Sequence, residues 1–209
     1  MARCGDLAKP FSAEHPRVLL VEGNDEFYLL LELLGQLELN VDVRVYDGVS
    51  ELAPTLMALG TGTARGFDSV TTMGVWRDAD IVADDALQSV QNALRLAGFA
   101  VPNASGGFAE GQPRVGLLIL PDGAAPGALE NVCVASVRDP AALPCIDGYI
   151  ECLQRAGVHL HPNLDKTRVH AFLASREEPG LKIGEAAKAR HWDFSHPAWQ
   201  PLIEFLRAM

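Results

Sequence analysis

Residues 17–26 have the sequence RVLLVEGNDE, and this stretch decides the fold. The first five residues form an apolar run rich in Val and Leu, which predicts a strand that is buried on both faces. From Asn24 onward the apolar residues recur at helical spacing, so we expect a helix over residues 25–39 with Asn24 near its N-cap. Glu22 and Gly23 therefore stand where the strand ends and the helix begins.

A second stretch repeats this design later in the chain. Residues 70–80 have the sequence VTTMGVWRDAD, a strand pattern that runs directly into acidic residues. In an extended segment the side chains of Asp78 and Asp80 point to the same side, roughly 7 Å apart. Arg77 precedes this pair, and the alternation of side chains along a strand could turn it away from the two carboxylates.

Strands and helices alternate over the first two thirds of the chain. Further strands are predicted at residues 41–47 and 114–122, and further helices at residues 50–60, 84–97 (with Asp84 as N-cap) and 126–136. This order predicts an α/β fold, Rossmann-like, with a mostly parallel sheet of about four strands flanked by helices.

The rest of the chain is predicted to be mostly helical. The helical patterns lie at about residues 141–156, 165–174, 181–190 and 197–207. We therefore expect a loose N-terminal arm over residues 1–16, an α/β core over 17–135, and a helical C-terminal region over 136–209 that packs on the core.

The acidic residues at the strand ends predict a metal site. Because ligands of such sheets bind at the carboxyl ends of the strands, Glu22, Asp78 and Asp80 are expected to lie near one another. Their carboxylates repel one another unless a cation lies between them. Mg²⁺ (or Mn²⁺) suits carboxylate ligands and keeps water molecules that a phosphate can displace. The alternative is that these acids are helix caps and solvated loop ends.

The two stretches resemble the Toprim fold of topoisomerases, bacterial primases and overcoming-lysogenisation-defect (OLD) nucleases. Glu22, Gly23 and Glu26 match the first Toprim motif, and Asp78-Ala79-Asp80 matches the second. Val82 stands where topoisomerases and primases often have a third Asp. The OLD nucleases use a later Glu instead.

The resemblance to the OLD branch implies roles for further residues. Glu130, in LLILPDGAAPGALENV, is the candidate for the later Glu, and Lys166 matches a functional basic residue. With NLDKTRVHAFLAS and GEAAKARHWDFSHPAW, nearly the whole chain resembles a bacterial family of stand-alone Toprim proteins, domain of unknown function family 3226. The resemblance implies metal ligands and catalytic residues as follows: metal, Glu22, Asp78, Asp80 and Glu130; catalytic, Glu22, Glu26 and Lys166.

Composition limits the partners. The formal net charge is −10 and the isoelectric point is about 5.0, which argues against tight non-specific binding to nucleic acid but does not exclude a nuclease with a metal-neutralised site. No apolar run approaches the length of a membrane span, and no signal peptide is visible. We expect a soluble, cytoplasmic protein with free, buried cysteine thiols.

These observations leave three functions to weigh. The first is a divalent-metal-dependent phosphotransfer enzyme, in particular a nuclease acting on DNA or RNA phosphodiesters. The second is a non-catalytic Toprim module that binds a metal, a nucleotide or a partner in a defence or regulatory assembly. The third is a receiver-like phosphoacceptor domain, which fits the Glu-Gly and DxD spacing less well.

A few other residues have simpler explanations. Asp122 lies in a Pro-Asp-Gly turn and is otherwise a candidate beside the site. His159 and His161 could share a metal, but surface positions suit them better. The aromatic and apolar residues near the C-terminus predict a core cluster, with base stacking as the alternative: Trp192, Phe194, Trp199, Leu202 and Phe205.

Overall fold

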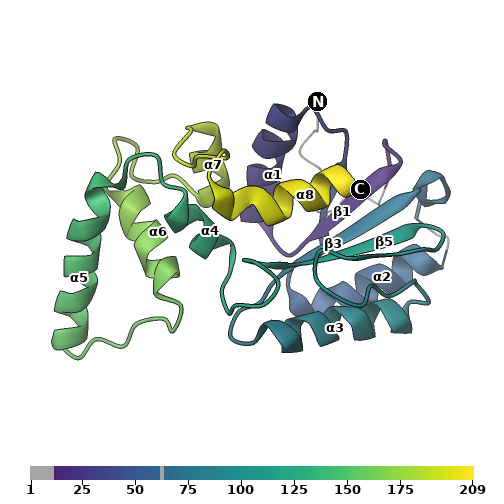
Figure 1. The fold of residues 1–209 in the computed structure, drawn as a ribbon, viewed down its shortest axis with the longest axis horizontal. Coiled ribbons are helices and arrows are strands. Elements are labelled where there is room, and N and C mark those ends of the chain that lie inside the picture. The colour runs from purple at the N-terminus through teal and green to yellow at the C-terminus, as the bar shows by residue number, and fades with distance from the viewer. Residues whose placement is uncertain (1–11, 62–63) are drawn as a thin grey trace.

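The computed structural model describes residues 12–61 and 64–209, and in these it has a five-stranded sheet (Figure 1). The order across the sheet is β2-β1-β3-β5-β4. The strands are β1 (Arg17–Val21), β2 (Asp42–Val45), β3 (Thr72–Asp78), β4 (Phe108–Ala109) and β5 (Arg114–Leu120).

Helices follow the strands and cover the sheet. The α-helices are α1 (Asn24–Leu37), α2 (Leu52–Gly60), α3 (Ala83–Leu96), α4 (Leu129–Ala135), α5 (Leu143–Arg155), α6 (Leu164–Ala174), α7 (Ile183–Lys188) and α8 (Gln200–Ala208). Short 3₁₀ turns occur at Val49–Glu51, Phe67–Ser69, Pro140–Ala142 and Pro197–Trp199. Among the described residues no helix is both long enough and apolar enough to cross a bilayer.

The predicted fold class is confirmed, with one strand added. Strands β1, β2, β3 and β5 are parallel, while β4 pairs with β5 in the antiparallel sense. The sequence prediction missed β4 because a strand of two residues is too short to show a period-two pattern. The four parallel strands all point their carboxyl ends toward one edge of the sheet, as the site prediction requires.

Each face of the sheet has its own apolar core. Leu19 and Val21 point into the core under α1, α7 and α8, whereas Val18 and Leu20 point into the core under α2 and α3. Figure 1 shows α2 and α3 on one side of the sheet and α1 and α8 on the other, with α5 and α6 extending beyond the sheet. Because both faces are covered, residues 18–21 of β1 are apolar on both faces, as the sequence predicted.

The predicted C-terminal cluster is confirmed as part of a core. Trp192, Phe194, Trp199, Leu202 and Phe205 are all buried in the core beneath α1. Base stacking is therefore excluded for these side chains, because they are covered by protein. The division of the chain at residues 135 and 136 stays a prediction.

Two predicted helix caps and part of the cysteine prediction were wrong. Gly23, not Asn24, precedes α1, and Val82, not Asp84, precedes α3. In both cases an earlier residue is extended, so the cap lies one residue sooner in α1 and two residues sooner in α3 than the side-chain preference suggests. Cys133 is buried as expected, but Cys145 and Cys152 are exposed, and Cys4 lies outside the described residues.

The described part of the N-terminal arm is tied to the core by Asp42, the first residue of β2. The Asp42 carboxylate accepts hydrogen bonds from the backbone N–H groups of Glu14 (2.6 Å) and His15 (2.9 Å), and lies 2.8 Å from His15 Nδ1. Burial opposes ionisation of Asp42, but these hydrogen bonds outweigh it and lower the pKa below its ordinary value of 3.8. The expected loose arm is thus held in place from Ser12 onward.

We expect Asp42→Ala to destabilise the protein by about 1–3 kcal/mol at neutral pH, because it leaves donors of the arm without their acceptor. A lowered folded-state pKa stabilises above pH 3.8, and this contribution is lost as the pH falls through the folded pKa. Urea unfolding at neutral and acidic pH measures it, so the variant and wild type should converge in acid. Glu14→Ala keeps the same backbone donor and should change little; an equal loss there would contradict the role of Asp42.

Candidate functional site

The candidate site lies at the carboxyl edge of the sheet. Glu22 follows β1 directly, and Asp78 is the last residue of β3. Val21 pairs with Val45 and Leu20 pairs with Val75. These registers, continued by one or two residues, place Tyr46 and Arg77 on either side of Glu22.

The DxD segment is joined to the loop before α4. Asp80 N–H donates to the carbonyl of Gly127 (2.8 Å), and Gly127 N–H donates to the carbonyl of Asp80 (2.9 Å). Both residues have positive φ, 53° for Asp80 and 145° for Gly127. Asp tolerates this conformation better than most residues, and Gly tolerates it best. The two-way bridge brings the first turn of α4, with Glu130, next to Asp78.

The surroundings of Asp78 disfavour its ionised form. Its Oδ1 atom is inaccessible and has no hydrogen-bond partner, although the residue as a whole keeps some exposure. The carboxyl group accepts a hydrogen bond from the backbone N–H of Leu129. Burial, followed by the nearby charges of Glu26 and Glu130, raises the pKa of Asp78 well above its ordinary value. The charge of Lys166 opposes this increase only in part, and no described group donates a hydrogen bond to Oδ1.

Glu22 and Glu26 are perturbed in the same direction. Burial, followed by the charge of Asp80, raises the pKa of Glu22, while Arg77 and Lys166 oppose the increase. Burial is also the main cause that raises the pKa of Glu26 to about 7. The side chain of Glu26 lies close to Gly23 at the end of β1. A Cβ at Gly23 would lie 3.0 Å from Glu26 Oε2. A residue with a side chain at position 23 would therefore displace Glu26.

Lys166 supplies positive charge from α6. Its Nζ atom donates to Glu130 Oε1 at 2.8 Å. Burial favours the neutral amine, but the hydrogen bond and the charge of Glu130, with those of Asp78 and Asp80, raise the pKa of Lys166. The ammonium group therefore stays protonated beside the acids. The structure thus brings together Glu130 and Lys166, which lie 36 residues apart in the sequence.

A polar network fixes α6 against α4. Asn131 accepts from the backbone N–H of Ala128 (2.8 Å) and from Asn163 Nδ2 (2.8 Å), and donates to Asp165 Oδ2 (2.7 Å). Arg168 donates to the other oxygen of Asp165 at 2.8 Å. Residues on both sides of Lys166 are thereby held, which positions its ammonium over Glu130. Asn131 was not predicted from the sequence, since a lone Asn in a helix gives no signal for such a network.

The acids form two groups at the strand ends, and Glu26 links one group to the other. Glu22 interacts electrostatically with Asp80, Asp78 interacts with Glu26 and Glu130, and Glu26 also interacts with Glu22. In the described residues no set of three or more His, Cys, Asp or Glu side chains is already arranged as a metal-binding cluster. Mg²⁺ commonly uses one or two carboxylates and keeps several waters, so either group has a suitable donor set. The unpartnered Oδ1 of Asp78 fits a cation there.

Several predicted candidates lie outside this site. Asp122 Oδ1 accepts from the backbone N–H groups of Ala124 (2.9 Å) and Ala125 (2.7 Å), which confirms its role in a turn. His159 and His161 are exposed, as the simpler explanation predicted. Their positions leave the acidic edge as the candidate site.

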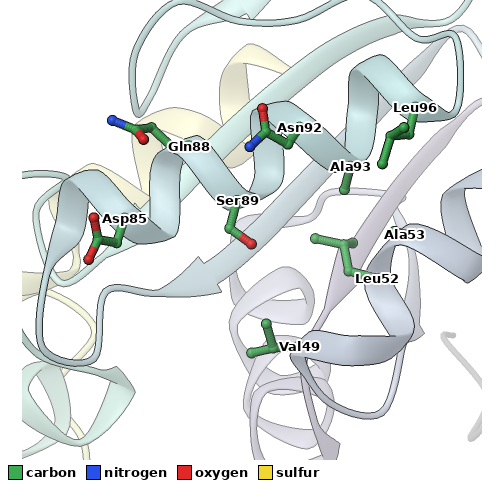
Figure 2. A pocket seen from close by; sticks show the side chains of 9 residues that line it. All are labelled: Val49, Leu52, Ala53, Asp85, Gln88, Ser89, Asn92, Ala93 and Leu96. Atoms are coloured by element: carbon green, nitrogen blue, oxygen red, sulfur yellow. The ribbon is translucent and has the colours of Figure 1, made fainter.

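A separate hollow lies between α2 and α3 (Figure 2). Its volume is about 360 Å³, and its walls come from the turn before α2, the start of α2 and one side of α3. Asp85, Gln88 and Asn92 line it from α3, and Val49 and Leu52 line it from the opposite side. Glu22, Glu26, Asp78, Asp80 and Glu130 do not line this hollow, so the chemistry of the site does not depend on it.

The fold and this edge define an α/β protein with a mostly parallel sheet and acidic residues where its strands end. The chain belongs to the family described as Protein of unknown function (DUF3226), whose model matches residues 16–209. This confirms the family that the sequence predicted. A comparison with curated proteins gives no match.

Among solved structures, the C-terminal region of the Burkholderia pseudomallei OLD protein is similar to this chain. The two are 14% identical, the alignment covers 94% of this chain and 98% of that chain, and the TM-score is 0.45.

Proposed function

We propose that the protein is a divalent-metal-dependent phosphotransfer enzyme, specifically a nuclease that hydrolyses DNA or RNA phosphodiesters. The observation that carries this proposal is the carboxyl group of Asp78. Its buried Oδ1 has no partner among the described residues, and burial, followed by the charges of Glu26 and Glu130, raises its pKa. Natural proteins seldom retain such an arrangement without a functional reason.

Glu22, Asp78, Asp80 and Glu130 would hold Mg²⁺ or Mn²⁺ at this edge. Bound there, the metal supplies positive charge that stabilises the oxygens of a phosphodiester undergoing displacement. Removal of the Asp78 proton then becomes favourable, because the carboxylate gains a partner for Oδ1. A bound cation would thus stabilise the ionised carboxylates of this edge, which otherwise repel one another.

Glu26 and Lys166 would act on the substrate. The pKa of Glu26, about 7, allows this carboxyl group to take a proton from an attacking water at neutral pH. Lys166 is held at 2.8 Å from Glu130 and stays protonated, so its ammonium can donate to a phosphate oxygen. Glu26 would then accept the proton of the attacking water, and Lys166 would stabilise the negative charge on an oxygen bound to phosphorus.

Purified protein should cleave single- or double-stranded DNA or RNA in Mg²⁺ or Mn²⁺ and lose this activity with a chelator. Asp80→Asn should reduce cleavage on the order of 100-fold, because a metal ligand contributes several kcal/mol to the transition state. Asn accepts the positive φ of 53° at this position, so the backbone bridge to Gly127 is retained.

Asp84→Asn is the matched control for that assay. Asp84 is exposed in the first turn of α3, a few residues beyond Asp80. Cleavage should be unchanged in this variant. Metal-dependent cleavage that survives Asp80→Asn at the wild-type rate would sink the proposal, as would the absence of cleavage of every nucleic acid tested.

A second candidate function is a non-catalytic module that binds a metal together with a nucleotide or protein partner. Two observations favour it: the net charge of −10 opposes contact with a long polyanion, and Lys166 is already paired with Glu130. Calorimetry with Mn²⁺ and nucleotides would detect binding. Saturable binding without turnover would favour this module over the nuclease.

A further inference from the structure

Tyr46, Glu22 and Arg77 form a row across β2, β1 and β3. The registers of these parallel strands place the three residues opposite one another at the carboxyl edge. Backbone Tyr46 N–H donates to the carbonyl of Val21 at 2.9 Å, so the pairing extends into this row. Strand alternation puts Arg77 on the same face as Val75, which is the face covered by α2 and α3. The alternation that turns Arg77 away from Asp78 brings it beside Glu22.

Among the described residues, the guanidinium group of Arg77 has no hydrogen-bond or ion-pair partner. Its Nε and Nη1 atoms are inaccessible and make no hydrogen bond. Within residues 12–61 and 64–209, Arg77 also forms no ion pair with the neighbouring Glu22. Since Nη2 is not among the buried unpartnered atoms and makes no hydrogen bond, it is the nitrogen that a ligand can reach.

Such a group needs an explanation. Burying a charged donor without a partner has a large desolvation cost. An anion that accepts hydrogen bonds from the donor offsets this cost. Guanidinium binds phosphate and carboxylate oxygens especially well, because its planar N–H groups match their geometry. No carboxylate in the described part of the chain accepts a hydrogen bond from Arg77, although Glu22 is next to it in the row and the charge of Arg77 acts on Glu22.

Tyr46 closes the other end of the row. It is buried, and its hydroxyl donates to the carbonyl of Trp76 at 3.2 Å. That bond fixes the phenol against β3 and leaves the hydroxyl hydrogen unavailable to a ligand. Glu22 therefore lies between the neutral, fixed phenol of Tyr46 and the guanidinium group of Arg77.

We propose that Arg77 is the phosphate-binding residue of this site, and that Nη2 donates to a non-bridging oxygen of a phosphate group brought to the edge by the cation that Glu22 helps to hold. This inference rests on the proposed metal site. It adds a second positive group from β3, separate from Lys166 on α6. The guanidinium group of Arg77, beside Glu22, and the ammonium group of Lys166, beside Glu130, would both contact the phosphate group.

Inorganic phosphate is the probe, titrated into the full chain by calorimetry with and without saturating Mn²⁺. Wild type should bind phosphate in the presence of Mn²⁺. Arg77→Lys should weaken phosphate binding about tenfold, because the point charge of an ammonium replaces the planar fork. Arg77→Met, which has similar bulk without charge, should abolish detectable binding. Electron paramagnetic resonance of Mn²⁺ should show that both variants still bind the metal.

Arg155→Met is the control, because Arg155 is exposed in the last turn of α5. It should bind phosphate as wild type does. Phosphate binding that is unchanged in both Arg77 variants, or no phosphate binding by wild type, would overturn the inference. Arg77→Lys identifies the contact even if Arg77→Met does not fold.

The same titration separates this inference from the nuclease proposal. Phosphate binding through Arg77 in a protein that cleaves no nucleic acid would support the inference and count against the nuclease. Cleavage with no role of Arg77 in phosphate binding would leave the nuclease and remove the inference.

Discussion

The Asp78→Asn variant is expected to unfold at a higher temperature than wild type in metal-free buffer at neutral pH, and to lose metal-dependent cleavage. Removal of a functional but unfavourable group typically stabilises a protein by roughly 0.5–2 kcal/mol. Asn keeps the shape of the side chain and an oxygen that can accept from Leu129 N–H. It removes the negative charge that burial, Glu26 and Glu130 oppose.

The pH dependence of this effect has a definite sign. The pKa of Asp78 is raised in the folded state above its ordinary value of 3.8, so the folded protein retains a proton that the unfolded chain releases. Wild type therefore loses stability as the pH rises above 3.8 toward the folded pKa, and Asp78→Asn does not. The difference between the two proteins should thus be small in acid and largest at neutral pH.

Thermal unfolding with and without Mg²⁺ measures both parts of this prediction. Mg²⁺ should raise the midpoint of wild type, because a ligand of the folded state stabilises it, and should raise the midpoint of Asp78→Asn much less. Asp122→Asn is an instructive control: hydrogen bonds from Ala125 and Ala124 lower the pKa of Asp122, so this change should not stabilise the protein. A variant of Asp78 that is less stable than wild type at neutral pH would contradict the description of the site.

Gly184→Ala is expected to have the largest effect on stability. Gly184 lies in α7, where this short helix packs tightly against α1. A Cβ at this position would overlap the Cβ of Tyr28 and would lie 3.1 Å from both the carbonyl oxygen of Asp25 and the backbone nitrogen of Leu29. The obstacles are backbone atoms and a Cβ, so no side-chain rotation can make room.

Overpacking of this kind typically costs 1–3 kcal/mol, and we expect Gly184→Ala to fall near the upper end. Denaturant unfolding gives the free energy directly. Gly35→Ala is the matched control within α1, since a Cβ there meets nothing within 4 Å. Replacing an unhindered helical Gly by Ala should stabilise by about 0.5–1 kcal/mol. Equal free energies of unfolding for Gly184→Ala and wild type would show that α7 does not contact α1 as described.

Much of the fold could be predicted from the sequence because it depends on local patterns. The apolar runs of β1, β3 and β5 and the helical spacing of α1 and α3 are visible within single segments. The acids at the strand ends follow from the same patterns, because parallel strands present their carboxyl ends at one edge. Strand β4 and the helix caps were not predicted correctly, since each depends on a few backbone atoms rather than on a repeated pattern.

The sequence by itself determined the α/β class, the family, and the acids Glu22, Asp78 and Asp80 at the strand ends. Only the tertiary structure decided how these acids are grouped. The backbone hydrogen bonds between Asp80 and Gly127 place the start of α4 next to Asp78. The hydrogen bonds of Asn131 position α6 so that Lys166 contacts Glu130. The strand registers likewise put Arg77 beside Glu22. The physical reason is that charge and burial act through space, so the pKa of each acid depends on neighbours that are distant in the chain.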